Sequence, residues 1–280
     1  MPTDKFPRIS SLPGLVQCPG FAVLRAVGED GGSVAADTGS VVGRVCELWH
    51  RKGEGPTALE EALQQVLTDP KGVPEHPRAD MEEVRAHATG YTNDPRNRGM
   101  VVPELCEQEV TLTLQPAPED PTGQPLVIVG HIDQVRRVPN QPGVFKVWDL
   151  KNGKPGGLEM LYSYALQLAA YTLALNETLG SNSSGPTRKV FLPGGIVRLR
   201  AYAPKKRGEP KVPGEENALY EAPWTIDQCR DMVATAVQHL AWIRTGIIHL
   251  QPGVHCQWCP AGGPHLCPEK IRRLPTIPSF

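Results

Sequence analysis

Acidic and basic side chains follow two short apolar runs near the middle of the chain. Asp133 comes directly after the run that begins at Leu126, and Asp149 and Lys151 end the run that begins at Val144. Carboxylates at the edge of an apolar core are costly without a partner. A divalent cation held by carboxylate oxygens removes that cost, and it can activate water and neutralise charge on a phosphate. With a lysine to orient the attacking water, these residue types are suited to phosphodiester hydrolysis.

Both runs are predicted to be β-strands, because the first is rich in β-branched residues and the second alternates between apolar and polar residues. A Gln-Pro-Gly turn signal lies between them. Side chains two positions apart share one face of a strand. Asp149 therefore points the same way as Lys151, and His131 the same way as Asp133. We expect the two runs to form a hairpin that places Asp133 beside Asp149.

A long amphipathic helix is predicted from Leu158 to Leu179, just after the second run. Gln167 and Tyr171 are four residues apart and lie on one face of this helix, next to Tyr164. The adjoining apolar stripe is predicted to pack on the core. It consists of Leu158, Leu161, Ala165, Leu168, Thr172, Leu175 and Leu179.

These features together resemble the PD-(D/E)XK nuclease superfamily, in the RecB-type branch that carries a C-terminal iron–sulfur cluster. That branch includes the CRISPR-associated iron–sulfur exonuclease and related phage nucleases. The resemblance implies an α/β fold with a central mixed β-sheet flanked by helices, similar to restriction endonucleases, and a cysteine-ligated metal-cluster subdomain built from both termini. It also implies a metal-dependent deoxyribonuclease, most simply an exonuclease acting on DNA ends or single strands.

The resemblance assigns roles to particular residues of this chain. Asp133, Asp149 and the carbonyl of Leu150 would hold Mg²⁺ or Mn²⁺, and Lys151 would orient the nucleophilic water. The residues that correspond to the catalytic set are Asp133, Asp149, Lys151, Gln167 and Tyr171.

A second helix, predicted from Asp37 or Thr38 to about Arg51, departs from the family pattern. Where the family has a histidine that often completes the metal shell, this chain has Gly43. Glu47, one turn later, is the first candidate to replace it as a metal ligand.

His131 is a second candidate. Glu47 can equally be a surface acid, and His131 a hydrogen-bonded neighbour. The stretch from Leu105 to Leu114 alternates as a strand, with Glu107 and Glu109 on one face. Because the family often has a glutamate where this strand begins, one of the two can lie near the site, but the sequence does not say which.

Seven cysteines lie along the chain, and three of them are close together near its end. Cys256 and Cys259 form a Cys-x-x-Cys pair, and Cys267 follows. Three thiolates at this spacing suit one metal centre, either zinc or an iron–sulfur cluster. In a zinc site, His255 or His265 can replace one thiolate.

The resemblance implies a [4Fe–4S] cluster whose fourth ligand is Cys18, which precedes a proline. The simpler reading of Cys18 is a buried thiol. The remaining cysteines are predicted to be structural: Cys46, Cys106 and Cys229.

Other elements are placed by local signals. Capping boxes predict helices that begin near Thr57 and near Thr225. A further helix is predicted over residues 80–92, a polar loop over 181–193 and a strand over 196–203. The resulting organisation is an N-terminal segment (1–36) with the first cluster cysteine, a nuclease core (37–250), and a C-terminal cysteine segment (251–280) that closes on the N-terminus.

The net charge of −1 excludes a protein that coats nucleic acid through bulk charge, so DNA contacts must come from local cations. Candidates are the basic run 204–207 and the loop with Arg96 and Arg98, both of which also read as solvated loops. No apolar segment is long enough to span a bilayer, and the first residues lack a signal-peptide core. A cytoplasmic location is therefore expected.

Two rival functions remain open from the sequence. A non-catalytic DNA-binding or assembly module with the same fold is favoured by the missing histidine at Gly43. A structural zinc protein with an incidental Asp-x-Lys is the other. Nuclease activity that is lost when Lys151 is replaced would distinguish a nuclease from the binding module. Iron with acid-labile sulfide, as opposed to zinc alone, would distinguish it from the zinc protein.

Overall fold

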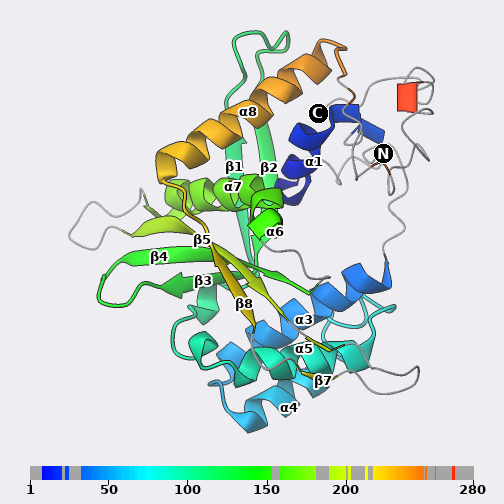
Figure 1. Ribbon diagram of the computed structural model, residues 1–280, viewed down its shortest axis with the longest axis vertical. Helices are drawn as coiled ribbons and strands as arrows, with labels where there is room; N and C mark the ends of the chain where they lie inside the picture. Colours follow the sequence, from blue (N-terminus) through cyan, green and yellow to red (C-terminus); the bar gives the residue numbers. More distant parts are fainter. Residues whose placement is uncertain are drawn as a thin grey trace.

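A mixed four-stranded β-sheet forms the centre of the computed structural model (Figure 1). The structure describes residues 8–20, 23–24, 33–152, 158–180, 189–199, 201–202, 212–213, 217–248, 250, 256 and 267–268. The strand order is β3-β4-β5-β8, with β4 and β5 parallel and the outer pairs antiparallel. The strands are β3 (Gln134–Arg137), β4 (Val144–Lys151), β5 (Val190–Arg198) and β8 (Ala218–Glu221).

A separate antiparallel pair, β1 (Gln108–Leu114) and β2 (Leu126–Ile132), stands next to this sheet. The predicted pairing of β2 with β4 is wrong. The chain bends at Asp133, and β3, which follows the bend, is the strand that pairs with β4. Asp133 therefore lies at the corner between two sheets. A short pair, β6 (Ala201–Tyr202) and β7 (Val212–Pro213), forms a third sheet.

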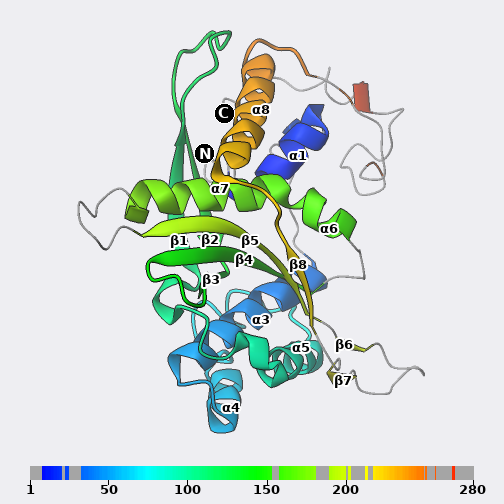
Figure 2. The same ribbon diagram turned by 60° about the vertical axis from the view of Figure 1, so that its left-hand side comes forward.

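Helices cover both faces of the central sheet, as Figure 2 shows. On one face lie α1 (Leu12–Gln17), α6 (Leu158–Ser163), α7 (Ala165–Leu175) and α8 (Ile226–Arg244). On the other lie α3 (Val34–Arg51), α4 (Pro56–Gln65) and α5 (Met81–Asn93). Each side has its own buried apolar cluster, one around Ile128, Phe191 and Leu175, the other around Trp49, Trp148 and Val197. The predicted α/β fold with a mixed sheet flanked by helices is confirmed.

The helix over the site, α3, begins earlier than predicted. Ser33, not Asp37 or Thr38, is the N-cap, and its hydroxyl accepts a hydrogen bond from Ala36 N at 3.1 Å. Asp37 in the first turn instead binds the guanidinium of Arg78 at 3.0 Å. This ion pair ties the segment before α5 to the start of α3.

The long helix predicted from Leu158 to Leu179 is interrupted. It breaks at Tyr164, which has φ −108° and ψ 6°, and α7 then ends at Leu175 in one π-helical turn, η4 (Asn176–Gly180). Leu, Ala and Gln favour a helix on both sides of the break. The break therefore reflects tertiary contacts of Tyr164, which are described with the site below.

Strand β5 begins at Val190, inside the segment predicted to be a loop. Its Pro193-Gly194-Gly195 sequence reads as a turn, but the register with β4 shifts here between Val147 and Trp148. A Cβ on Gly195 would lie 2.0 Å from the carbonyl oxygen of Tyr220 on β8. The glycine is needed because two neighbouring backbones approach closely at this bulge.

Local helix signals were partly reliable. The capping box at Thr225 is present at the start of α8, and Asp80 caps α5. The box predicted at Thr57 is absent, because α4 already starts at Pro56 with Gly55 before it. Single 3₁₀ turns complete the described helices: η1 (Ile9–Ser11), η2 (Pro95–Asn97) and η3 (Pro103–Leu105).

The arginines of the loop after α5 serve the fold. Arg96 binds Asp94 at 2.7 Å and the carbonyl oxygen of Asn217 at 2.6 Å, and Arg98 donates to the carbonyl of Thr92. The basic run 204–207 lies outside the described residues. In the described part of the chain, no helix combines the length and apolarity needed to cross a membrane.

Candidate active site

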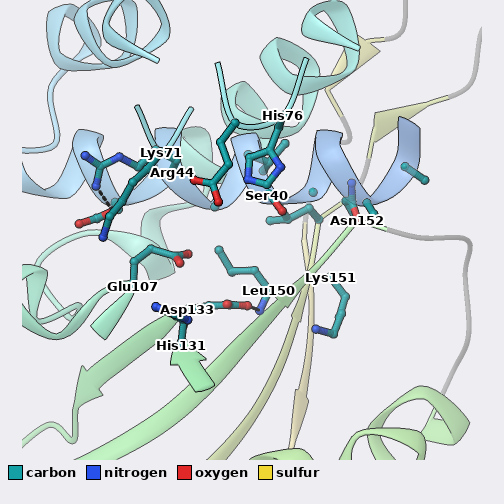
Figure 3. Close-up of a pocket in the computed structure, with 18 of the residues that line it drawn as sticks. Ser40, Arg44, Lys71, His76, Glu107, His131, Asp133, Leu150, Lys151 and Asn152 are labelled. Carbon is teal, nitrogen blue, oxygen red and sulfur yellow. Dashed lines mark hydrogen bonds and ion pairs between the residues drawn. The ribbon is translucent and has the colours of Figure 1, made fainter. Parts of the chain in front are cut away.

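A cavity of about 520 Å³ opens where the ends of β2 and β4 meet α3 (Figure 3). The strand side contributes Glu107, His131, Asp133, Leu150 and Lys151, and α3 contributes the opposite wall with Gly39, Gly43 and Glu47. The loop between α4 and α5 adds Lys71, Glu75 and His76. Four predicted site residues therefore line one cavity, although they come from three separate stretches of sequence: Glu47, Asp133, Leu150 and Lys151.

Asp149 lies just beneath this cavity, with a side chain that is 1% exposed. Its Oδ1 accepts a hydrogen bond from Gln167 Nε2 at 3.0 Å, and its Oδ2 lies 2.5 Å from Lys151 Nζ. Gln167 Nε2 is also 3.4 Å from the hydroxyl of Tyr171. The i, i+2 spacing on β4 and the i, i+4 spacing on α7 thus bring four predicted site residues into one connected group.

Asp133 joins this group from the bend between β2 and β3. Its Oδ2 accepts a hydrogen bond from the backbone N–H of Leu150 at 2.6 Å, which fixes it against the Asp-x-Lys segment. Burial raises the pKa of Asp133 well above its ordinary value, and the charges of Asp149 and Glu107 raise it further. The site therefore concentrates negative charge that its own residues do not fully neutralise.

Glu107 supplies a third carboxylate that the sequence left unassigned. Burial, followed by the charge of Glu47, raises the pKa of Glu107 to about 7. Its backbone lies in the left-handed region at φ 50°, which is strained for a residue with a side chain. It precedes β1 and does not belong to that strand, so the alternation with Glu109 on one face does not hold. Glu109 is instead exposed and lies 3.5 Å from His131.

The space in front of Gly43 is filled by Glu107. A Cβ at position 43 would lie 2.9 Å from Glu107 Oε1, closer than side chains normally approach. The glycine in place of the family histidine is therefore matched by a carboxylate that enters from the opposite wall. In the sequence, the family's glutamate near the start of this strand pointed to either Glu107 or Glu109. Only the backbone conformation at Glu107 shows that Glu107 is the one that enters the cavity.

Glu47 lines the cavity, but two arginines hold its carboxylate. Arg44 Nη1 lies 2.5 Å from Glu47 Oε2, and Arg51 Nη2 lies 2.8 Å from Oε1. Arg44 also binds Asp69 at 2.6 Å. The other candidate from the sequence, His131, is 53% exposed at the rim. His50 is buried and bonded to Glu54 and Tyr91, so it belongs to the packing of α3.

Lys151 is held between a carboxylate and an aromatic ring. Burial lowers the pKa of its ammonium, but the nearby charges of Asp149 and Asp133 outweigh that effect and raise it. Lys151 Nζ lies 4.5 Å from the centre of the Tyr164 ring, a favourable cation–π distance. The break between α6 and α7 places this ring over the ammonium.

If the site hydrolyses DNA, as the sequence resemblance implies, replacing Tyr164 by alanine should lower the cleavage rate of linear DNA by about 5- to 30-fold, because a cation–π contact contributes roughly 1–2 kcal/mol to the position of the ammonium. Tyr164→Phe keeps the ring and should retain nearly all of the rate. Steady-state kinetics with both variants provide the test. Equal losses in the two variants would show that the hydroxyl, not the ring, matters.

The donor atoms around the cavity suit a hard divalent cation. They are carboxylate and carbonyl oxygens, which are the ligands that such cations take in proteins. Within the described ranges, no three His, Cys, Asp or Glu side chains converge closely enough to hold a metal ion as they stand. Lys151 is the cation that faces Asp149 in this arrangement.

The cysteines divide into two groups. Cys46, Cys106 and Cys229 are buried, and burial raises the pKa of each thiol, that of Cys229 to about 11. Such thiols are unreactive, in line with a structural role. Cys18 is buried at the end of α1, and the segment Cys267–Pro268, red in Figure 1, lies at the same end of the molecule as α1. Cys259 lies outside the described residues.

Comparison with known families identifies this arrangement. The model of the PD-(D/E)XK nuclease superfamily matches residues 9–268. The chain belongs to this superfamily. The match runs from η1 to Pro268, so it includes the bend at Asp133, the Asp149-x-Lys151 segment of β4 and the Gln167 and Tyr171 pair of α7. A search of curated proteins finds no match to the chain.

Membership in the PD-(D/E)XK superfamily confirms the resemblance seen in the sequence at the level of the superfamily. Its members are generally nucleases, many of which use Mg²⁺ or Mn²⁺, and a nuclease fold implies a nucleic-acid substrate. The iron–sulfur branch is a finer assignment that rests on the cysteine pattern.

Proposed function

We propose that this protein is a metal-dependent DNA nuclease that hydrolyses phosphodiester bonds, as an exonuclease on DNA ends or single strands. The observation that carries the proposal is the junction of Asp133 with the Asp149-Leu150-Lys151 segment. These residues meet at one cavity through the 2.6 Å and 2.5 Å contacts described above. The preference for ends is taken from the resemblance to the RecB-type branch.

Asp133, Asp149 and the carbonyl of Leu150 would hold Mg²⁺ or Mn²⁺ in this proposal. When bound, such a cation lowers the pKa of water and neutralises charge on the phosphate. Glu107 is added to the set because its carboxylate lines the cavity and forms no ion pair with the described residues. Glu47 remains a candidate that acts only if Arg44 and Arg51 release it.

Lys151 orients the water that attacks phosphorus, because its ammonium both contacts Asp149 and lines the cavity. Gln167 holds Asp149 in place through the 3.0 Å hydrogen bond and leaves the other carboxylate oxygen for Lys151. Tyr171 supports Gln167 from the next turn of α7. In this proposal Lys151 acts on the attacking water, and Gln167 and Tyr171 position Asp149.

The rival of a non-catalytic binding module is less well supported. Its best argument was the missing histidine at Gly43, and Glu107 occupies the space in front of that position. Asp149 and Lys151 are also in contact, and Asp133 accepts a hydrogen bond from the backbone of Leu150 between them. A module that had lost its reaction would not need this concentration of buried charge.

A test of the proposed function uses end-labelled single- and double-stranded linear DNA with Mg²⁺ or Mn²⁺, and a closed circle beside it. We expect metal-dependent shortening of the linear substrates and an intact circle. Cutting of the circle as well would make the protein an endonuclease with the same site. No cleavage by folded protein with either cation would overturn the nuclease proposal in favour of a binding module.

We propose further that Cys18, Cys256, Cys259 and Cys267 hold a [4Fe–4S] cluster that joins segments 1–36 and 251–280 beside the nuclease core 37–250. Support comes from the Cys-x-x-Cys spacing and from the location of α1 and the red Cys267–Pro268 segment at the same end of the molecule in Figure 1. A link between residues this far apart in sequence closes a very long loop of the chain and therefore stabilises the fold. Zinc with the same four sulfurs is the alternative.

Replacing Cys18 by serine should remove the iron and acid-labile sulfide of anaerobically purified protein and lower its melting temperature or solubility. Cys229→Ser is the matched control, because this thiol is buried near the start of α8 and is not one of the four proposed ligands. Metal analysis and visible absorbance give the readout. Zinc without sulfide in the parent protein would select the zinc site, and unchanged iron in Cys18→Ser would exclude Cys18 as a ligand.

A further inference from the structure

Two of the cations that line the cavity form no ion pair with a carboxylate in the described part of the chain. Arg44 is paired with Glu47 and Asp69, and Lys151 is paired with Asp149. Lys71 and Arg8 also line the cavity, and neither forms an ion pair with any described residue. Both side chains are exposed. They are therefore the positive charges at this cavity that remain available for an anionic ligand.

Lys71 is presented by a braced loop between α4 and α5. Its backbone N–H donates to Asp69 Oδ1 at 2.9 Å, and Asp69 is bound in turn by Arg44 of α3. The next residue, Gly72, packs so closely that a Cβ there would lie 2.3 Å from the carbonyl oxygen of Val66. The loop is thereby fixed against α3, on the wall that faces Asp133 and Leu150 in Figure 3. The charge of Lys71 also acts across the cavity on Glu107, where it offsets part of the rise in pKa that burial and Glu47 cause.

Arg8 approaches the cavity from the strand side. Its backbone forms an isolated parallel bridge with Val129 of β2, and its carbonyl accepts from Ser11 N at 2.9 Å. The next residue, Ile9, is fully buried and lies against Gly130, where a Cβ would be only 2.9 Å from the isoleucine. Ile9 therefore anchors the position of Arg8 beside the middle of β2.

We propose that Lys71 and Arg8 each bind one phosphate of the DNA backbone, Lys71 from the α3 side of the cavity and Arg8 from the strand side. This inference rests on the proposed function, since it describes how the substrate of that site is held. A backbone that crosses the cavity between the two cations brings an intervening phosphodiester to Asp133 and Lys151. The acid Glu75, on the same loop as Lys71, also lines the cavity.

Two measurable properties follow from this arrangement. Each lysine or arginine that neutralises a phosphate releases condensed counterions, so each contributes about 0.7–0.9 to the slope of log affinity against log salt concentration. Phosphate contacts also carry no sequence information. Loss of either cation should therefore weaken binding equally for different DNA sequences.

The experiment measures binding of a labelled DNA oligonucleotide by fluorescence anisotropy, in EDTA and again in Ca²⁺, over a series of salt concentrations. We expect Lys71→Gln and Arg8→Gln each to weaken binding and to lower the salt slope by about 0.7–0.9, and the double variant to lower it by about twice that. Lys146→Gln is the matched control. Lys146 lies on β4, is paired with Glu221 at 3.0 Å and does not line the cavity.

The outcomes of this experiment are separable from those of the cleavage test. Unchanged affinity and slope in either single variant, with an unchanged melting temperature, would overturn the two-phosphate proposal even if the parent protein cleaves DNA. Losses that depend on the DNA sequence would also overturn it. If the parent protein binds DNA with the expected slopes but never cleaves, the phosphate contacts stand and the nuclease proposal fails.

Discussion

Replacing Lys151 by methionine should reduce cleavage of linear DNA by about 10²- to 10⁴-fold, the range typical for loss of a group that assists proton transfer or stabilises the transition state. Methionine keeps much of the length of the side chain and can still contact the ring of Tyr164. It removes the ammonium that lies 2.5 Å from Asp149 Oδ2. The loss should therefore appear in kcat, while the affinity for DNA, measured in Ca²⁺, changes little.

The same substitution should lower the stability of the metal-free protein. It leaves Asp149, which is 1% exposed, without its counter-charge. The Lys151 side chain is 23% exposed, so solvent reduces the effect to about 1–3 kcal/mol, below that of a fully buried pair. Lys146→Met, on the same strand, should be nearly neutral in rate and stability, because its pair with Glu221 is exposed. Retention of full activity in Lys151→Met would exclude this site as the catalytic centre.

Replacing Asp133 by asparagine should abolish cleavage and, at the same time, make the metal-free protein more stable by about 1 kcal/mol. Burial and the charges of Asp149 and Glu107 disfavour the ionised form of Asp133, as its raised pKa indicates. Asparagine carries no charge, and its oxygen can still accept the hydrogen bond from Leu150 N. Removing one of the crowded negative charges therefore favours the folded state at neutral pH.

Thermal unfolding in EDTA tests this prediction, with Asp120→Asn as the control. Asp120 is also buried, but it lies 2.5 Å from Arg244 Nη1, and its pKa is lowered despite burial by hydrogen bonds from Thr122 and Arg244. That substitution should destabilise the protein and leave cleavage unaffected in folded protein. A lower melting temperature for Asp133→Asn would show that its charge is satisfied in the fold, which would remove the electrostatic argument for a cation site.

The residues of the candidate site could be gathered from the sequence because short-range spacing fixes most of their geometry. Asp149 and Lys151 meet through the two-residue period of β4, and Gln167 and Tyr171 through one turn of α7. The placement of Asp133 beside them was predicted, but through the wrong strand pairing. Nothing at Asp133 itself marks the bend, since the glycine of this run, Gly130, lies within β2 and residues 131–137 contain no glycine or proline.

The identity of the carboxylate near Gly43 required the structure. Alternation favoured Glu107 and Glu109 equally, and only the positive φ of Glu107 turns its side chain into the cavity. The neutralisation of Glu47, by contrast, was readable in advance. Arg44 and Arg51 stand three residues before it and four after it, the spacings at which helical side chains meet. Helix spacing therefore predicts that Glu47 is paired with arginines, whereas the family pattern favours Glu47 as a metal ligand.

The bend at Asp133 has a thermodynamic consequence for the β1–β2 pair. Glu107 and Asp133 stand at the base of that pair, whereas Asp149 and Leu150 belong to the central sheet. A cation bound by groups from both sheets would be lost whenever the β1–β2 pair opens, so opening would cost an additional RT ln(1 + [cation]/Kd). Amide hydrogen exchange at Val110 and Ile128 would then slow in proportion to cation occupancy, while exchange within α8 would not. The β1–β2 pair would thus report ligand binding through its own local stability.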